Sequence, residues 1–116
     1  MRISRLRDGA SIEKIGVEYV LKAPLDKTLL PNSLTKVYLG LVIEPPEGLQ
    51  PIVIDEEALA ADNVLIAGKT LFVDEEDGEA YVRLYNMNVD SRYIHAGDVL
   101  CHFMLVQYGA PELEDE

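Results

Sequence analysis

Alternating apolar and polar positions run through much of this chain and predict β-strands. In residues 36–43 every second residue is apolar, which places four side chains on one face of a strand: Val37, Leu39, Leu41 and Ile43. Residues 79–86 repeat the pattern with two opposite faces, one of Ala80, Val82 and Leu84 and the other of Tyr81, Arg83 and Tyr85. Residues 99–106 are apolar on both faces except at His102, which is typical of a strand covered on both sides. We therefore expect residues 99–106 to lie at the centre of the core.

Turn-forming residues interrupt these strands at short intervals. They occur at Pro24, Pro31–Asn32, Pro45–Gly48, Pro51, Asp77–Gly78 and Ala96–Asp98. This spacing is typical of an all-β sandwich or barrel. One stretch, residues 55–62, combines helix-forming residues with acidic residues at its start, where the helix dipole favours them. We expect at most two helical turns there and an all-β fold elsewhere.

The length and composition fit one folded domain. With 116 residues the chain has room for one core, and its 48% hydrophobic content supplies the apolar surface to fill it. Four of the last five residues are acidic, and little in that segment can be buried. We predict a folded domain over residues 1–108 and a flexible acidic tail over residues 109–116.

The formal net charge of −11 disfavours polyanionic partners, because phosphate contacts are made chiefly by lysine and arginine. We therefore expect no duplex nucleic acid as a partner. Three of the ten basic residues lie near the start: Arg2, Arg5 and Arg7. Two interpretations stay open for them, a basic edge that meets an acidic surface or a small phosphate, and a solvated first strand.

Signals for a membrane or an oxidising compartment are missing from the sequence. No apolar run approaches the roughly 20 residues of a membrane-spanning helix, and the first residues lack the apolar stretch of a signal peptide. Cys101 is the single cysteine, and its apolar neighbours predict a buried, unreactive thiol. We expect an intracellular, cytoplasmic protein without a membrane partner, located in the host cytoplasm or the virion if the protein is viral.

Two charged segments invite a ligand interpretation. Gly68-Lys69-Thr70 resembles the end of a phosphate-binding P-loop, but Asn63 stands where that motif needs its first glycine. Lys69 is therefore either a solvent-facing hairpin residue or a ligand contact. Residues 74–79 contain five carboxylates: Asp74, Glu75, Glu76, Asp77 and Glu79. These side chains either bind a hard cation or belong to a solvated turn.

The histidines do not complete a recognisable site. His95 and His102 have no second cysteine with which to bind zinc, so we interpret them as structural. A pH-sensitive subunit contact stays open for His102. Cys101 and His102 are adjacent on a predicted strand and point to opposite faces, which disfavours a nucleophile and base pair.

Three segments together resemble the dUTP pyrophosphatase (dUTPase) family: Leu41–Gly48, Asn63–Asp74 and Tyr93–Leu100. The first looks like paired strands that end in a Pro-Glu-Gly turn. The second has the length of the family's substrate-binding hairpin, and the third contains the Gly-Asp pair that opens the last core strand. The resemblance covers residues 1–107 in layout. It implies an all-β, barrel-like fold of the β-clip type that assembles as a homotrimer, with sites at the subunit interfaces.

The catalytic motifs of that family are degenerate here. Val20 stands where the first motif has an aspartate, and acids stand where the family grips phosphate, at Asp55–Glu57 or Glu56–Ala58 according to the register. Asp74 aligns with the water-activating aspartate, but the tyrosine of that motif is missing. The fourth motif lacks its Arg and Gln, and the glycine-rich fifth motif is absent.

The resemblance without its motifs implies a non-catalytic relative. Our first hypothesis is a catalytically inactive homotrimer that binds or sequesters a small nucleotide or nucleotide signal in clefts between subunits. The candidate ligand-binding residues are Gly68, Lys69, Asp74, Arg83 and Arg92. We expect no catalytic residue, no metal ligand and no cofactor, with Mg²⁺ only as a companion of residual nucleotide binding. Two alternatives stay open: a structural or interaction trimer such as a virion or particle component, and a residual metal-dependent nucleotide hydrolase that uses Asp74.

Overall fold

The most extensive strand pairing, between β7 and β12, lies in a four-stranded antiparallel sheet with the order β2–β3–β12–β7. Its strands are β2 (Ile12–Ile15), β3 (Glu18–Lys22), β7 (Leu49–Asp55) and β12 (Val99–Gln107). β12 pairs with β3 along one edge and with β7 along the other, and a register shift interrupts the β3 pairing between Val99 and Cys101. The computed structural model describes residues 1–107, so the predicted tail lies outside the described residues.

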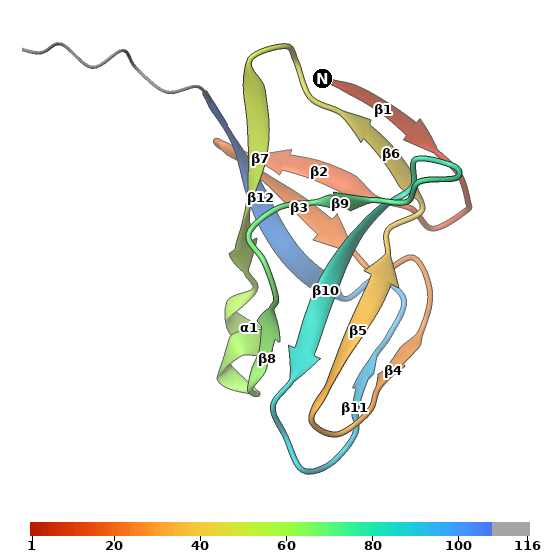
Figure 1. The fold of residues 1–116 in the computed structure, drawn as a ribbon, viewed down its shortest axis with the longest axis vertical. Coiled ribbons are helices and arrows are strands. Elements are labelled where there is room, and N and C mark those ends of the chain that lie inside the picture. The colour runs from red at the N-terminus through yellow and green to blue at the C-terminus, as the bar shows by residue number, and fades with distance from the viewer. Residues whose placement is uncertain (108–116) are drawn as a thin grey trace, which may run out of the picture.

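A second antiparallel sheet is organised around β10 (Figure 1). Its strands are β5 (Ser33–Tyr38), β8 (Val64–Ile66), β9 (Phe72–Val73) and β10 (Ala80–Asn86). β10 pairs with β5 along one edge and with both β8 and β9 along the other. Strand β10 therefore connects segments that are far apart in the sequence.

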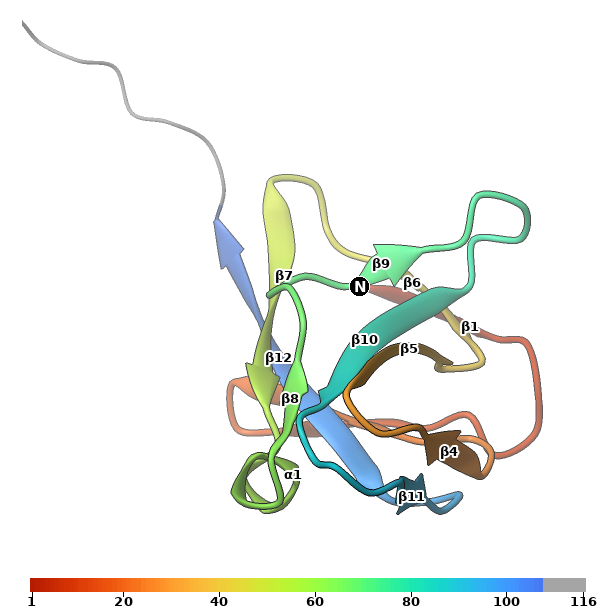
Figure 2. The ribbon, with the colours of Figure 1, turned by 60° about the horizontal axis from the view of Figure 1, so that its bottom comes forward.

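Two short ribbons and one helix complete the fold. The ribbons pair β1 (Arg2–Arg5) with β6 (Leu41–Glu44), and β4 (Lys27–Leu29) with β11 (Arg92–Ile94). Helix α1 (Glu57–Ala61) lies beside β8 (Figure 2) and confirms the short helix expected within residues 55–62. Within residues 1–107 no helix is long and apolar enough to cross a membrane.

The core takes side chains from both sheets, as the alternating pattern predicts. On β10, Val82 and Leu84 are buried while Tyr85 on the opposite face is exposed. On β12, Leu100, Cys101 and Phe103 are fully buried. The structure therefore confirms the predicted apolar face of residues 79–86 and the central position of residues 99–106.

The single strand expected over residues 36–43 is wrong. The chain leaves β5 at Tyr38, passes through Leu39 and Gly40, and continues as β6 in a different sheet. Gly40 has φ +70°, a left-handed conformation that favours glycine and ends regular strand geometry. Two residues separate the strands, so the alternation is preserved and Leu39 and Leu41 are both buried.

The segment 63–74 does not pair with itself as a hairpin. Its two strands, β8 and β9, lie on the same edge of β10, and each forms its own pairing with that strand. Five residues, 67–71, connect them and include Gly68 at φ +88°. The true hairpin is the one that joins β9 to β10.

Candidate functional site

The turn between β9 and β10 is acidic, and the backbone engages two of its carboxylates. The Oδ1 atom of Asp74 accepts a hydrogen bond from the Glu76 amide at 2.9 Å. The Oδ1 atom of Asp77 accepts one from the Glu79 amide, also at 2.9 Å. Gly78 has φ +75° and donates its amide to the Asp74 carbonyl at 3.0 Å. Asp74 and Asp77 therefore fix the shape of the turn as well as adding charge.

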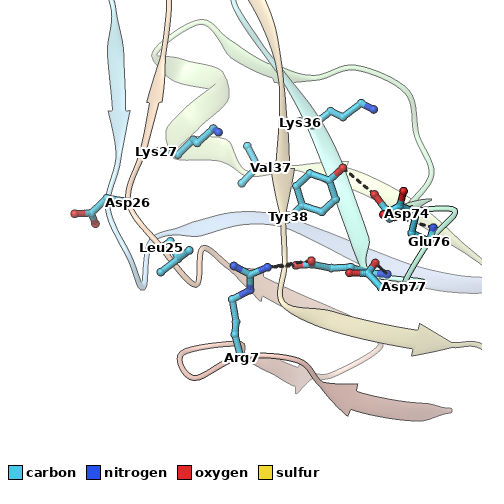
Figure 3. Close-up of a pocket in the computed structure, with 11 residues that line it drawn as sticks. Arg7, Leu25, Asp26, Lys27, Lys36, Val37, Tyr38, Asp74, Glu76 and Asp77 are labelled. Carbon is cyan, nitrogen blue, oxygen red and sulfur yellow. Dashed lines mark hydrogen bonds and ion pairs between the residues drawn. The ribbon is translucent and has the colours of Figure 1, made fainter.

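A cavity of about 430 Å³ opens beside this turn. Figure 3 shows its lining residues: Arg7, Leu25, Asp26, Lys27, Lys36, Val37, Tyr38, Asp74, Glu76, Asp77 and Glu79. Three of these side chains are cationic and five are carboxylates. This charge balance suits a small polar ligand better than a polyanion.

Tyr38 and Asp74 meet at the wall of this cavity. The Tyr38 hydroxyl donates a hydrogen bond to Asp74 Oδ2 at 3.2 Å (Figure 3). The Glu76 amide has the largest effect on the pKa of Asp74 and lowers it; burial opposes this, and the Tyr38 hydroxyl adds to the lowering, so the pKa lies below its ordinary value. Burial and the nearby Asp74 carboxylate raise the pKa of Tyr38. At neutral pH Asp74 is therefore an ionised acceptor and Tyr38 a neutral donor.

Arg7 and Glu79 form a second polar contact in the same wall. Arg7 Nη2 lies 3.0 Å from each of the two Glu79 carboxylate oxygens, and the Gly40 amide donates to Glu79 Oε2 at 2.7 Å. Glu79 is only 4% exposed, so the expectation that it belongs to a solvated turn is wrong. A buried carboxylate needs such partners, because an unpaired buried charge is costly.

Arg2 and Arg7 each contact an acid of the same chain, Arg2 with Glu44 at 3.7 Å and Arg7 with Glu79 at 3.0 Å. Contact of the N-terminal arginines with another acidic surface or a small phosphate stays a prediction. Arg2 and Arg5 lie on β1 with exposed side chains, as a solvated first strand predicts. Arg7 lies beyond β1 and contacts an acidic residue of its own chain.

Two of the predicted ligand-binding residues come together around Phe72. The guanidinium carbon of Arg83 lies 4.1 Å from the centroid of the Phe72 ring. Gly68 packs so closely that an added Cβ atom would lie 3.1 Å from Phe72 and 3.2 Å from Arg83 Nη2. Asp74, a third predicted residue, lies in the wall of the cavity.

Lys69 and Arg92 lie elsewhere. The Lys69 carbonyl accepts a hydrogen bond from the Val53 amide at 3.0 Å, and the residue borders a separate hollow of about 180 Å³. Arg92 Nε donates to Asp62 Oδ2 at 2.9 Å. The five predicted residues therefore do not form one site within this single chain, and their roles in ligand binding stay predictions.

Sequence reasoning did not select five lining residues of the cavity: Leu25, Asp26, Lys27, Lys36 and Tyr38. Lys36 and Tyr38 alternate with Val37, so they occupy the polar face of the strand that the pattern predicted. Attention to that polar face, as well as to the apolar one, is the sequence signal that could have found them.

The remaining candidate residues have structural surroundings. His102 Nε2 lies 2.5 Å from Glu56 Oε2, and both side chains are half-buried, which fits a structural histidine. Burial raises the pKa of Cys101 to about 12, so its thiol stays protonated and unreactive. In the part of the chain that the structure describes, no group of three or more His, Cys, Asp or Glu side chains is placed to hold a metal ion.

The order and pairing of the strands define an all-β, dUTPase-like fold. The dUTPase of Staphylococcus bacteriophage 80alpha, in a mutant form with dUpNHpp, matches with a TM-score of 0.79 and 14% sequence identity over 99% of this chain and 86% of that chain. A mutant dUTPase of S. aureus phage phi11 matches with a TM-score of 0.79 and 15% identity over 99% of this chain and 95% of that chain. No protein-family model and no curated protein matches the sequence.

These matches confirm the all-β, dUTPase-like fold expected from the sequence. The phi11 structure is described as showing the coordination of a structural Mg(II) ion in that protein. Within residues 1–107 of this chain, no three His, Cys, Asp or Glu side chains lie together in a way that could hold a metal ion.

Proposed function

We propose that this protein is a dUTPase-like subunit that binds a small nucleotide-type ligand without hydrolysing it, and that it works as a homotrimer. The observation that carries the proposal is the pairing of Tyr38 with Asp74 at the wall of the 430 Å³ cavity. That wall offers an aromatic ring, a fixed acceptor and nearby cations. The wall also contains Asp74, which aligns with the family's water-activating aspartate. The lowered pKa of Asp74 makes it a poor general base.

The cavity supplies groups that recognise a nucleoside. The Tyr38 ring offers an aromatic surface, and the Asp74 carboxylate can accept a hydrogen bond from a base or sugar donor. Lys27 and Lys36 also line the cavity, and within residues 1–107 neither forms an ion pair. These two ammonium groups are therefore available to a ligand with limited negative charge.

Two features oppose hydrolysis of a triphosphate. A general base works best when its pKa is near the working pH, and the pKa of Asp74 is shifted away from that range. Carboxylates outnumber cations in the cavity, and Arg7, one of the three cations, is already engaged by Glu79. A triphosphate would be repelled rather than held there.

Assembly is supported by apolar side chains that one subunit leaves exposed. Five of them lie on the β4–β5 connection, the start of β5, the end of β10 and the connection that follows it: Leu30, Leu34, Tyr85, Met87 and Val89. Leu34 and Tyr85 are directly opposite each other in the β5–β10 register. An apolar surface of this kind marks a contact site, and it equally supports the second candidate function, a structural trimer.

Native mass spectrometry of the full chain tests these proposals together. The protein is measured alone and after incubation with dUTP, dUMP, deoxyuridine and cyclic nucleotides. We expect a trimer that carries an intact nucleoside or nucleotide. A trimer without ligand across the whole panel would favour the structural candidate.

Turnover of dUTP would contradict the non-catalytic proposal, and the Asp74→Asn variant locates its source. Activity that disappears in this variant would favour a residual hydrolase centred on Asp74. Activity that survives would point to a contaminating enzyme and would leave the proposal standing. The Asp8→Asn variant is the matched control, because Asp8 is exposed and lies outside the cavity.

A further inference from the structure

The sheet β2–β3–β12–β7 has apolar side chains on both of its faces. On one face Val53, Cys101 and Phe103 are buried in the core. On the opposite face the register of β12 and β7 brings together four apolar side chains, which we call the outer sheet face: Ile52, Ile54, Met104 and Val106. All four are half-buried, and within residues 1–107 none belongs to the core or packs against it.

The outer sheet face leaves β12 covered on one side only by the described chain, although its sequence is that of a strand covered on both. An antiparallel sheet with one face in water usually alternates apolar with polar side chains, so a second apolar face indicates a further layer. His102 is the polar position of β12 on this face, and its Nε2 atom lies 2.5 Å from Glu56 Oε2. The outer sheet face is therefore a contact surface for another molecule.

A second apolar surface lies at a different end of the molecule. It consists of the exposed apolar side chains around the β4–β5 connection and the end of β10, which we call the end patch: Leu30, Leu34, Tyr85, Met87 and Val89. In Figure 1 the end of β12 and the start of β7 lie at the top, whereas the start of β5 and the end of β10 lie toward the bottom. One chain therefore cannot cover either surface with the other.

A homotrimer needs two such surfaces on every subunit. Subunits of a ring with three-fold symmetry meet head to tail, so each contacts its two neighbours through two different surfaces. Contact of one surface with its own copy would instead give a two-fold dimer. The end patch supplies one surface, and the outer sheet face supplies a second of the same apolar character.

Charge also favours a second copy of this chain as the partner. With a formal net charge of −11, copies repel each other wherever unmatched acids face one another. The five side chains of the end patch carry no charge. On the outer side of the large sheet, Glu13 lies 4.0 Å from Lys22 and Glu56 is engaged by His102, which leaves Glu18 near the sheet edge. Two acidic copies can therefore meet at these surfaces with little repulsion.

We propose that the end patch of one subunit docks on the outer sheet face of the next, and that three such contacts close a ring. This inference rests on the proposed homotrimer and names its two contact surfaces. Docking removes both apolar surfaces from water, which is the dominant favourable term in most protein association. Each surface also contributes a methionine, Met87 or Met104, whose flexible side chain adapts to an irregular contact.

Cysteine cross-linking of the full chain tests this contact. Met87→Cys places a thiol in the end patch, and Met104→Cys places one on the outer sheet face. We expect the double variant to form covalent dimers and trimers with a short bismaleimide, while each single variant stays monomeric on a denaturing gel. Cys101 does not interfere, because its thiol is fully buried. Leu6→Cys combined with Met104→Cys is the matched control and should not cross-link, because Leu6 is exposed outside both surfaces.

A charge placed on the outer sheet face provides a second test. In Ile52→Asp the contact would bury a carboxylate without a partner, so the concentration at which the trimer dissociates should rise about 100-fold. Native mass spectrometry over a dilution series measures this change. The fold should persist, as judged by circular dichroism, because Ile52 does not pack against the core. Leu6→Asp, the control, should dissociate at the wild-type concentration.

The outcomes separate this inference from the proposed homotrimer. Dimers formed by Met87→Cys alone or by Met104→Cys alone would overturn the head-to-tail contact, because a surface would then meet its own copy. A wild-type trimer that the double variant does not cross-link and Ile52→Asp does not dissociate would overturn the inference and leave the homotrimer standing. A monomeric wild type would contradict both. Should Ile52→Asp not fold, the cross-linking experiment decides the question.

Discussion

Arg7 Nη2 lies 3.0 Å from both carboxylate oxygens of Glu79, a residue that follows it by 72 positions in the sequence. The contact joins the segment after β1 to the start of β10. Glu79 also accepts the amide of Gly40, so one buried carboxylate connects three separate parts of the chain. The acidic turn is thereby attached to the N-terminal segment at the edge of the cavity.

Replacing Arg7 with alanine should destabilise the protein. The change leaves the Glu79 carboxylate buried with only the Gly40 amide and no countercharge, which should lower the free energy of unfolding by about 1–3 kcal/mol. Urea denaturation followed by circular dichroism measures this loss. Arg5→Ala is the control, because Arg5 is exposed on β1, and its midpoint should stay close to that of the wild type. Equal midpoints for all three proteins would show that the ion pair does not contribute.

Gly40 and Gly48 offer a matched comparison of steric cost. Both have positive φ, at +70° and +83°, so alanine pays a similar conformational penalty at each position. At Gly40 the new Cβ would also lie 2.7 Å from Arg7 Cγ and 3.1 Å from Ala10 Cβ, whereas nothing lies within 4 Å at Gly48. Gly40→Ala should therefore lower the thermal midpoint clearly more than Gly48→Ala. Equal shifts would contradict the close packing of Arg7 on Gly40.

Asp74 should make stability depend on pH in the acidic range. Its folded pKa is lowered, chiefly by the Glu76 amide, so its contribution is present above the unfolded pKa near 3.8 and is lost as the pH falls through the folded value. Wild type should be more stable than Asp74→Asn at neutral pH, and the difference should shrink as the pH drops below 3.8. Urea midpoints measured across this range test the trend. A constant gap between wild type and Asp74→Asn across this range would refute the assigned pKa shift.

Cys101 should resist thiol reagents in the folded protein. Its side chain is fully buried and its pKa is raised to about 12, so almost no thiolate is present in mildly alkaline buffer. Ellman's reagent should react slowly with the native protein and at once after addition of concentrated guanidinium chloride. Immediate stoichiometric reaction under native conditions would contradict the buried position of β12.

Local alternation was enough to predict the strands that bury one face. The pattern of Ala80, Val82 and Leu84 requires only neighbouring residues, because strand geometry alone turns successive side chains to opposite faces. The apolar run of residues 99–106 likewise predicted a strand covered on both sides. These two features could be predicted from the local sequence because burial of apolar surface is the main driving force of the fold.

Long-range contacts could not be predicted in the same way. Nothing near Glu79 in the sequence distinguishes it from the exposed acids of the same turn, because its partner Arg7 is 72 residues away. The break after Tyr38 was missed for a related reason. Alternation continues through Gly40, and only the separate partners of β5 and β6 reveal that the chain changes sheets there.

The position of β12 has a consequence for how the molecule is made. Among residues 1–107 it is the last strand to be synthesised, yet it lies between β3 and β7 at the middle of its sheet. Until residues 99–107 emerge, the nascent chain therefore carries two strand edges without the neighbour that will pair them. Pairings between such distant segments form slowly, and exposed edges invite association with other chains. When β12 is synthesised it pairs with both β3 and β7, which completes the sheet and removes the exposed edges through which the nascent chain could associate with other chains.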